Sequence, residues 1–223
     1  MTATPAGPIR AVGVFGAGKS GVAIARRALA AGYRVRIATS GPADRTALVT
    51  GILTPGAVAV DASELAEGVD LVVLAVPLRR FRELPLDALA DRIVVDVMNY
   101  WPPIDGILPE FEDSARPSSE IVRDALPPTA MLVKTLNHIG YHEIEDLARA
   151  RSAPDRIALA IAGDDVRAAE TVARFVDDLG FDPAPAGGLA GSAVLQPGSA
   201  IFGADFGAQS LLHELAGMQA ARR

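Results

Sequence analysis

The chain has 223 residues, half of them hydrophobic, and a formal net charge of −6, which suits one large domain or one domain with a small appendage. The acidic balance argues against nucleic acid as a partner, because phosphate backbones require a basic surface. The absence of cysteine excludes disulfides and thiolate metal sites. The longest apolar runs, such as 71–76, are far shorter than the roughly 20 residues that span a bilayer. The first ten residues lack the apolar segment of a signal peptide, so we expect a cytoplasmic protein.

Short apolar runs alternate along the chain with segments of helical spacing. In chain order, the sequence predicts a strand over 9–15, a helix over 20–31 that Gly32 stops, and a strand over 34–38. A short helix over 61–67, a strand over 69–76 closed by Pro77, a helical segment over 86–89 and a strand over 92–97 follow. The rest of the chain is predicted to contain a helix over 118–126 capped by Ser119, strands over 131–136 and 157–162, an amphipathic helix over 165–179 that ends at Gly180, and a last amphipathic helix over 209–218.

Apolar strands that alternate with helices are typical of a parallel sheet covered on both faces. We therefore predict an α/β fold: a Rossmann-type, doubly wound, mostly parallel sheet over residues 1–185, with a small C-terminal extension, 186–223, packed on the same domain. The glycine-rich stretch 186–203 is predicted to be irregular, and the helix over 209–218 serves either this packing or a homodimer contact. In such sheets ligands bind at the carboxyl ends of the strands.

The segment Gly16-Ala17-Gly18-Lys19-Ser20-Gly21 follows a predicted strand and opens a predicted helix, which is the context that the dinucleotide fingerprint G-x-G-x-x-G requires. The first glycine allows a tight turn, the second lets the backbone approach a pyrophosphate, and the third lets helix and strand pack closely. Free N–H groups at the start of the helix then face the phosphates. The motif predicts a dinucleotide site.

The same residues also match a phosphate loop. Gly13 to Ser20 reads G-x-x-x-x-G-K-S, and the strand that ends at Asp96 would supply the magnesium-binding aspartate of a nucleotide triphosphatase or kinase. Three observations favour the dinucleotide. Gly21 has no role in a phosphate loop, and the run through Val14 and Phe15 is best interpreted as one continuous strand. The second predicted strand also ends in Thr39-Ser40, about 20 residues after the glycines, where a group that binds the ribose belongs.

The end of the second predicted strand bears on the choice of cofactor. Sites that prefer NAD place a carboxylate there, which binds the ribose diol and repels a 2′-phosphate. Here Thr39 and Ser40 stand at that point, followed closely by Arg45. This favours NADP(H), with Asp44 leaving NAD open if the loop folds back.

At this point the sequence resembles the NADP-dependent coenzyme F-420 reductase family (F-420 is a 5-deazaflavin), and more distantly the cytosolic domain of the six-transmembrane metalloreductases. The resemblance covers about residues 9–180. It is carried by Val14-Phe15-Gly16-Ala17-Gly18, Thr39-Ser40, Asp70-Leu71-Val72-Val73-Leu74-Ala75-Val76-Pro77, Val95-Asp96-Val97-Met98-Asn99, Ser118-Ser119-Glu120-Ile121-Val122 and Val133-Lys134-Thr135-Leu136-Asn137-His138-Ile139.

The resemblance implies a hydride transfer between NADP(H) and a deazaflavin or flavin-like acceptor, in which the protein supplies proximity, orientation and exclusion of water. It also implies roles for individual residues. Gly18, Lys19 and Ser20 would hold the pyrophosphate, Thr39 and Ser40 the 2′-phosphate, and Val76, Pro77 and Leu78 the adenosine or ribose, while Met98, Asn99, Asn137, His138 and Ile139 would line the nicotinamide and the acceptor, with Asn137 and His138 as the candidate catalytic pair.

Three departures from the family pattern bear on these roles. The family commonly has an arginine directly after the serine of the second strand; here Ser40 stands at that position, so Arg45 would have to compensate. The family's pocket histidine falls on Asn137, one place before His138. The stretch 195–199 matches the deazaflavin-binding end poorly, which leaves the acceptor open and keeps a non-catalytic NADP(H) sensor as the alternative function.

Other polar residues have more ordinary interpretations. His138 and His142 are four residues apart, but Gly140 interrupts the helix that a metal site would need, so we expect no metal. Lys134 is expected to pair with an acidic group at the sheet edge. Trp101 follows a strand and either caps the core or forms a stacking wall for a flat ring.

Overall fold

The computed structural model describes residues 9–112 and 115–220. Residues 1–8, to which the expectation of no signal peptide mostly applies, lie outside this range, as do 113–114 and 221–223. Within the described part of the chain, no helix has the length and the apolar character needed to cross a membrane.

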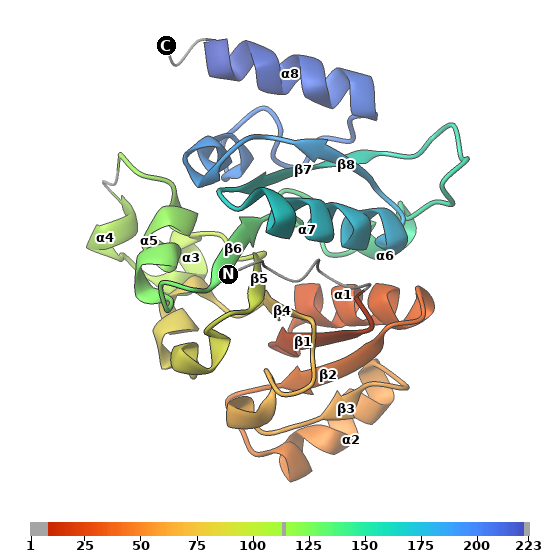
Figure 1. Ribbon diagram of the computed structural model, residues 1–223, viewed down its shortest axis with the longest axis vertical. Coiled ribbons are helices and arrows are strands. Elements are labelled where there is room, and N and C mark those ends of the chain that lie inside the picture. Colours follow the sequence, from red (N-terminus) through yellow and green to blue (C-terminus); the bar gives the residue numbers. More distant parts are fainter. Residues whose placement is uncertain (1–8, 113–114, 221–223) are drawn as a thin grey trace, which may run out of the picture.

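One eight-stranded sheet runs through the molecule, in the order β3-β2-β1-β4-β5-β6-β7-β8 (Figure 1). Strands β1 to β6 pair in parallel, β7 runs antiparallel to β6, and β8 is parallel to β7. The predicted mostly parallel, doubly wound α/β fold is confirmed. The strands are β1 (Ala11–Phe15), β2 (Arg34–Ala38), β3 (Val58–Ala59), β4 (Leu71–Leu74), β5 (Ile93–Asp96), β6 (Met131–Lys134), β7 (Ala158–Gly163) and β8 (Asp182–Pro185).

Helices cover both faces of this sheet. The α-helices are α1 (Lys19–Ala30), α2 (Ala43–Leu53), α3 (Pro102–Asp105), α4 (Pro109–Glu112), α5 (Ser118–Ala125), α6 (Glu143–Asp146), α7 (Val166–Leu179) and α8 (Ala208–Ala220), and the 3-10 helices are η1 (Ala62–Glu64), η2 (Leu78–Glu83), η3 (Leu86–Leu89) and η4 (Leu189–Leu195). The helices α1, α6 and α7 lie against one face, and η2, η3, α4 and α5 lie against the other.

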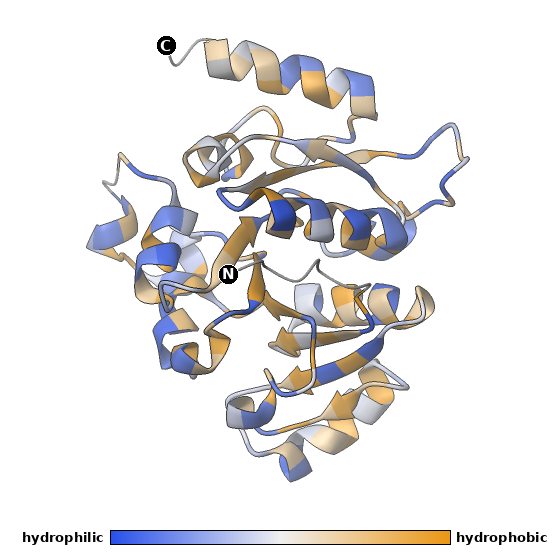
Figure 2. Ribbon diagram, viewed as in Figure 1, coloured by the Kyte–Doolittle hydropathy of each residue, from blue (hydrophilic) through white to orange (hydrophobic). Residues whose placement is uncertain are grey.

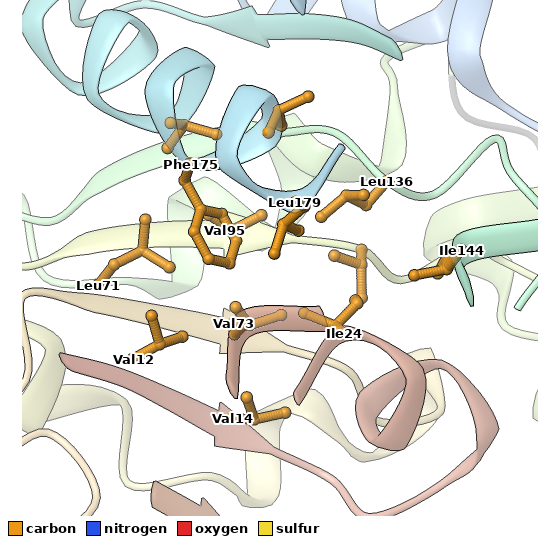
Figure 3. Packing of buried hydrophobic residues seen from close by; sticks show 14 of the residues in the cluster. Val12, Val14, Ile24, Leu71, Val73, Val95, Leu136, Ile144, Phe175 and Leu179 are labelled. Carbon is orange, nitrogen blue, oxygen red and sulfur yellow. The ribbon is translucent and has the colours of Figure 1, made fainter. Parts of the chain in front are cut away.

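The core between the sheet and the helices α1 and α7 shows why the central strands β1 and β4 are apolar throughout. Val12 and Val14 of β1 and Val73 of β4 point toward Ile24 of α1 and Phe175 of α7 (Figure 3). Neighbouring residues on the same strands point to the opposite face and are buried there as well, because successive side chains of a strand alternate. The central strands β1 and β4 are therefore hydrophobic along their length, whereas β2 has a hydrophilic stretch (Figure 2), as expected where a strand is buried on both faces in the middle of a sheet and less so toward its edge.

Helix α2 and the edge strands β3 and β8 are among the elements that the sequence prediction missed. Helix α2 has no apolar stripe, since it buries Thr46 and Thr50 and exposes Leu48 and Ile52. The edge strands β3 and β8 are short, and β8 contains two prolines, which are tolerated because an edge strand pairs on one side only. Two predicted helices are shorter or tighter than expected: 61–67 contains only the 3-10 turn η1, and 86–89 is the 3-10 helix η3.

The C-terminal extension packs against the last two strands. Leu195 and Ile201 from the predicted irregular stretch, with Leu211 and Leu215 of α8, form a buried cluster over alanines of β7 and β8. Helix α8 consequently lies beside the end of the sheet that β7 and β8 form (Figure 1).

Candidate functional site: a dinucleotide cleft

The turn after β1 can be built only with glycine at its two ends. Gly16 has a φ of +110°, and a Cβ there would lie 2.3 Å from the carbonyl oxygen of Ala75. A Cβ on Gly21 would lie 2.1 Å from the carbonyl oxygen of Gly16. Both distances are far inside van der Waals contact, so these glycines let the turn, β4 and α1 pack together.

Gly18 differs from the other two glycines of the motif. A Cβ on Gly18 would meet no heavy atom within 4 Å, and its φ of −77° is accessible to any residue. The fold therefore does not require glycine at this position. Its missing side chain leaves an open cradle in front of α1, where a ligand can approach the backbone.

The first turn of α1 has the features of an anion site. Its N-cap is Gly18, no side chain caps the free N–H groups, and there is no acidic residue in the first turn. Lys19 occupies the first helical position, where a positive charge is unfavourable beside the positive end of the helix dipole. A bound anion would accept hydrogen bonds from the free N–H groups and would offset the positive charge at the start of the helix. The diphosphate of a dinucleotide is an anion of this kind.

A cleft of about 560 Å³ opens beside this turn. One of its walls is the end of β2 with the following loop, and another is the end of β4 with η2. The lining residues are Phe15, Gly16, Ala17, Gly18, Ala38, Thr39, Ser40, Gly41, Pro42, Asp61, Ala62, Ser63, Ala75, Val76, Pro77, Arg80, Glu83 and Leu84. This is the place, beside the glycine turn, where a Rossmann sheet binds the adenosine half of a dinucleotide.

Hydroxyl groups lie at the end of β2, as the sequence predicted. The Thr39 hydroxyl is 2.8 Å from that of Thr46 and accepts a hydrogen bond of 3.2 Å from the Gly41 N–H. Ser40 is exposed to the cleft. A carboxylate is also present, from Asp61, which accepts a 2.7 Å hydrogen bond from the Ala43 N–H at the start of α2.

Several predicted cofactor contacts lie elsewhere. Leu78, the first residue of η2, is only 1% exposed, because its side chain packs in the hydrophobic core on the η2 face of the sheet. Arg45 is exposed on α2 and does not line the cleft. The Lys19 amine donates a 2.9 Å hydrogen bond to the Tyr141 hydroxyl on the other side of the turn. Ser20 and Ile139 are half-buried and outside the cleft as well.

The carboxyl ends of β5 and β6 are joined by a buried ion pair. Asp96 and Lys134 are fully buried neighbours on these strands, with their charged atoms 3.2 Å apart. The Asp96 carboxylate also accepts hydrogen bonds from the Ser119 hydroxyl at 2.8 Å and the Met98 N–H at 2.9 Å, and Lys134 donates to the Met98 carbonyl. The pair thus fixes the backbone of Met98. Lys134 has the expected acidic partner, although in the middle of the sheet rather than at its edge.

Two asparagines link the same strand ends a few residues later. Asn99 donates a 2.6 Å hydrogen bond to the Asn137 carbonyl, and Asn137 donates a 2.9 Å bond to the Asn99 side-chain oxygen. Asn137 also donates to the Leu195 carbonyl at 2.7 Å, which ties the C-terminal extension to this edge of the sheet. The preceding residue, Leu136, has a φ of +60°, a strained backbone conformation for a branched residue.

His138 is a structural residue rather than a candidate for proton transfer. It is 3% exposed, and its Nε2 accepts a 3.1 Å hydrogen bond from the Ala160 N–H. Burial, with the nearby Lys134 charge, lowers the pKa of His138 to about 3, so the ring is neutral at physiological pH. The expected catalytic role for this side chain is therefore not supported. Among the described residues, no group of side chains is arranged to hold a metal ion.

The phosphate-loop alternative conflicts with the structure. Gly13 is the central residue of β1 rather than the start of a loop. Asp96, the proposed magnesium ligand, is buried in the pair with Lys134, and the amine of Lys19 is turned to Tyr141. The geometry of the segment fits instead the strand and turn of a dinucleotide site.

Some residues of this region were not among the predicted site residues. Arg80 and Glu83 line the cleft from η2; the arginines after Pro77 were expected to be solvated, with one of them able to contact an anionic phosphate or carboxylate. Gln196 accepts a 2.8 Å hydrogen bond from the Ser118 N–H, at the start of α5, where Ser119 had been expected to act as the cap. No local signal identifies a cap that comes from 78 residues further along the chain.

The sheet order, the glycine turn and the cleft define a Rossmann-type dinucleotide-binding protein. Residues 11–100 match the family model described as NADP oxidoreductase coenzyme F420-dependent, so the resemblance seen in the sequence is confirmed over this segment. No curated protein matches the chain significantly. Together the fold and this match indicate an NAD(P)-dependent oxidoreductase.

Solved structures agree with this class. A hypothetical protein from Sinorhizobium meliloti, SMa0349, is 27% identical with a TM-score of 0.75, and the match covers 89% of this chain and 95% of that one. A structure from Arthrobacter sp. FB24, assigned provisionally as an F420-dependent NADP reductase, is 25% identical with a TM-score of 0.71, covering 88% and 97%. A reductive aminase from Aspergillus terreus in complex with NADPH shares the fold at 16% identity and a TM-score of 0.57, covering 96% and 64%.

Proposed function

We propose that this protein transfers a hydride between NADP(H) and a flavin-like acceptor, with the deazaflavin coenzyme F-420 as the first candidate. The observation that carries the proposal is the uncapped start of α1 beside Gly18, whose missing side chain serves no need of the fold. The family description and the Arthrobacter neighbour support the choice of acceptor.

The adenosine end of the cleft favours NADP(H) over NAD(H). Hydroxyls rather than a carboxylate follow β2, at Thr39 and Ser40, where a carboxylate would hold the ribose diol of NAD. Asp61 lines the same cleft, but its Oδ1 is engaged by the Ala43 N–H. The side chain of Arg80 supplies positive charge to the opposite wall.

At the other end of the site, the residues of this chain position rather than react. When bound, the nicotinamide ring supplies or accepts the hydride, so the protein needs no nucleophile. The Asp96–Lys134 pair fixes the backbone of Met98, and the side chains of Asn99 and Asn137 hold each other across β5 and β6. A rigid edge of this kind favours a reaction that depends on the alignment of two flat rings.

The test compares two glycines that both have room for a side chain. Gly18→Leu is expected to keep the thermal stability of the wild type and to lower NADPH affinity at least about tenfold, because the new side chain fills the cradle. Gly217→Leu on α8, also without a neighbour within 4 Å of its Cβ, is the matched control and should bind NADPH normally. Unchanged NADPH affinity in Gly18→Leu would refute the proposed site.

The acceptor is tested separately by following NADPH absorbance in the presence of F-420, FMN or FAD. The proposal expects oxidation of NADPH with F-420 or a free flavin. If NADPH binds tightly and no acceptor is reduced, the acceptor assignment fails, and a cofactor-sensing module becomes the better account of the same cleft.

A further inference from the structure

The cleft is lined both by the loop after β2 and by the wall at η2, and among its described lining residues it contains one positive side chain. Among the described residues that line the cleft, Arg80 alone carries a positive charge, while Asp61 and Glu83 are negative. A dinucleotide with a 2′-phosphate adds two negative charges next to the ribose. Such a ligand needs a cation near Thr39 and Ser40, and Arg45 lies outside the cleft.

Arg80 is held at this wall by its neighbour on η2. Its Nε and one terminal nitrogen donate hydrogen bonds of 2.9 and 2.7 Å to the same oxygen of Glu83. The pair is solvent-accessible, with the two side chains 40% and 59% exposed. An exposed ion pair of this kind contributes little to stability, so the guanidinium can leave it for a stronger partner at small cost.

The base of this segment is anchored. The N–H of Arg79 donates a 3.1 Å hydrogen bond to Asp105, and Leu78 and Phe81 are buried in the core. The backbone that carries Arg80 is therefore fixed, while its side chain is long and exposed enough to change partners. A planar guanidinium binds a phosphate through two parallel N–H donors. A phosphate also carries more negative charge than the single charge of the Glu83 carboxylate, so it is the stronger partner.

We propose that Arg80 is the cofactor-specificity residue of this site: its guanidinium binds the 2′-phosphate of NADP(H), and Glu83 is the partner that it leaves when the phosphate arrives. This inference rests on the proposed NADP(H) site and adds the residue that distinguishes NADP(H) from NAD(H). In the free protein Glu83 keeps the guanidinium at the rim of the cleft. The carboxylate therefore competes with the phosphate and weakens its binding.

The experiment measures the dissociation constants of NADPH, NADH and 2′,5′-ADP by calorimetry for the wild type, Arg80→Gln, Glu83→Gln and Arg82→Gln. Arg82 is the matched control, since it is two residues away, also in an exposed ion pair, with Glu110, and outside the cleft. Arg80→Gln is expected to lose about tenfold or more in affinity for NADPH and 2′,5′-ADP, with NADH affinity changed less than about twofold.

Glu83→Gln is expected to move in the opposite direction, with NADPH affinity raised about threefold. A gain in affinity cannot arise from misfolding, which protects the test if Arg80→Gln is unstable. Arg82→Gln should match the wild type.

Three results would overturn the assignment. Equal losses for NADPH and NADH in Arg80→Gln would mean that Arg80 contacts the part common to both cofactors. Unchanged NADPH affinity in Arg80→Gln, or weaker binding in Glu83→Gln, would also contradict it while leaving the proposed function standing. If the wild type binds neither NADPH nor 2′,5′-ADP, the proposed function itself fails together with this inference.

Discussion

The environment of His138 explains why a histidine beside the site has no acid–base role. Its Nε2 accepts a hydrogen bond from Ala160, which only the unprotonated nitrogen can do. Burial removes the water that would stabilise an imidazolium, and the charge of Lys134 opposes a second cation nearby. The ring therefore works as a polar core residue that links the end of β6 to β7.

The same environment makes folding stability depend on pH. The pKa of His138 falls from 6.5 in its ordinary state to about 3 in the fold, so between these values the unfolded chain binds a proton that the native state excludes. The free energy of unfolding must therefore fall as pH decreases below 6.5, by up to about 1.4 kcal/mol per pH unit.

Urea denaturation at two pH values isolates this contribution. Between about pH 7.5 and 5.5, the wild type is expected to lose about 1 kcal/mol more stability than His138→Gln, whose amide oxygen still accepts the Ala160 N–H. Carboxylates titrate in both proteins and cancel in the comparison. Parallel pH profiles for the two proteins would show that the imidazole is already solvated in the fold.

At the residue scale, the sequence predicts groups whose role is set by their neighbours along the chain. Gly16, Gly18 and Gly21 were identified because a strand precedes them and a helix follows. The role of His138 was misjudged and that of Arg80 was left open, since both depend on what the fold places beside them. No sequence pattern shows that Ala160 donates to His138 or that Arg80 lines the same cleft as the β2 loop.

Among the secondary-structure elements, α1 is the one whose sequence is poorly suited to stability. Its first position is Lys19, its first turn has no acidic residue, and Gly18 offers no capping side chain. A helix start optimised for folding alone would have the opposite charge and a cap. The loss of folding stability from this uncapped, positively charged helix start is small in the free protein, and a bound anion removes it.

Two substitutions of Lys19 separate stability from binding. Both Lys19→Glu and Lys19→Gln lose the contact with Tyr141, which consists of a hydrogen bond and a cation–π contact with 4.7 Å from the amine to the ring centroid. The glutamate variant is expected to be more stable than the glutamine variant by about 0.3–1 kcal/mol, and to bind NADPH more weakly.

Thermal unfolding with and without NADPH measures both effects. The prediction requires the order of the two variants to reverse when the cofactor is added, because the ligand stabilises only the native state that binds it. If the glutamate variant remains the more stable one at saturating NADPH, the start of α1 is not an anion site.

The elements that the sequence predicted well are those with a strong periodicity. The central strands and α7, which has a capping aspartate at Asp165 and a left-handed glycine at Gly180, fall within a few residues of the predicted bounds. Helix α2 and strand β8 were missed because their residues violate the usual pattern. An exposed, weakly amphipathic helix and a proline-containing edge strand are permitted by their place in the sheet rather than indicated by their composition.

For the whole molecule, the question is whether the C-terminal extension is a separate unit. It contacts the rest of the chain at the end of β6, at the start of α5 and over β7 and β8. Leu195 accepts a hydrogen bond from Asn137, and Gln196 accepts one from the start of α5. The side chain of Leu215 on α8 is 2% exposed against β7 and β8. These contacts predict that residues 186–223 and the nucleotide-binding sheet unfold together.

Two leucines on α8 provide the test. Leu215→Ala leaves a cavity in the cluster over β7 and β8, and is expected to lower the free energy of unfolding by about 2–5 kcal/mol. Leu212→Ala, on the same helix at a position 44% exposed, is the control and should cost less than about 0.5 kcal/mol.

The decisive measurement uses two probes of the same denaturation. Trp101 is the single tryptophan and lies next to α3, far from α8 in the molecule (Figure 1), whereas far-UV circular dichroism reports on all helices. If the extension and the sheet form one cooperative unit, Leu215→Ala shifts the fluorescence and circular dichroism transitions equally. A circular dichroism transition that moves while the Trp101 transition stays in place would mean that α8 unfolds by itself. The dinucleotide cleft would then be independent of the C-terminal extension.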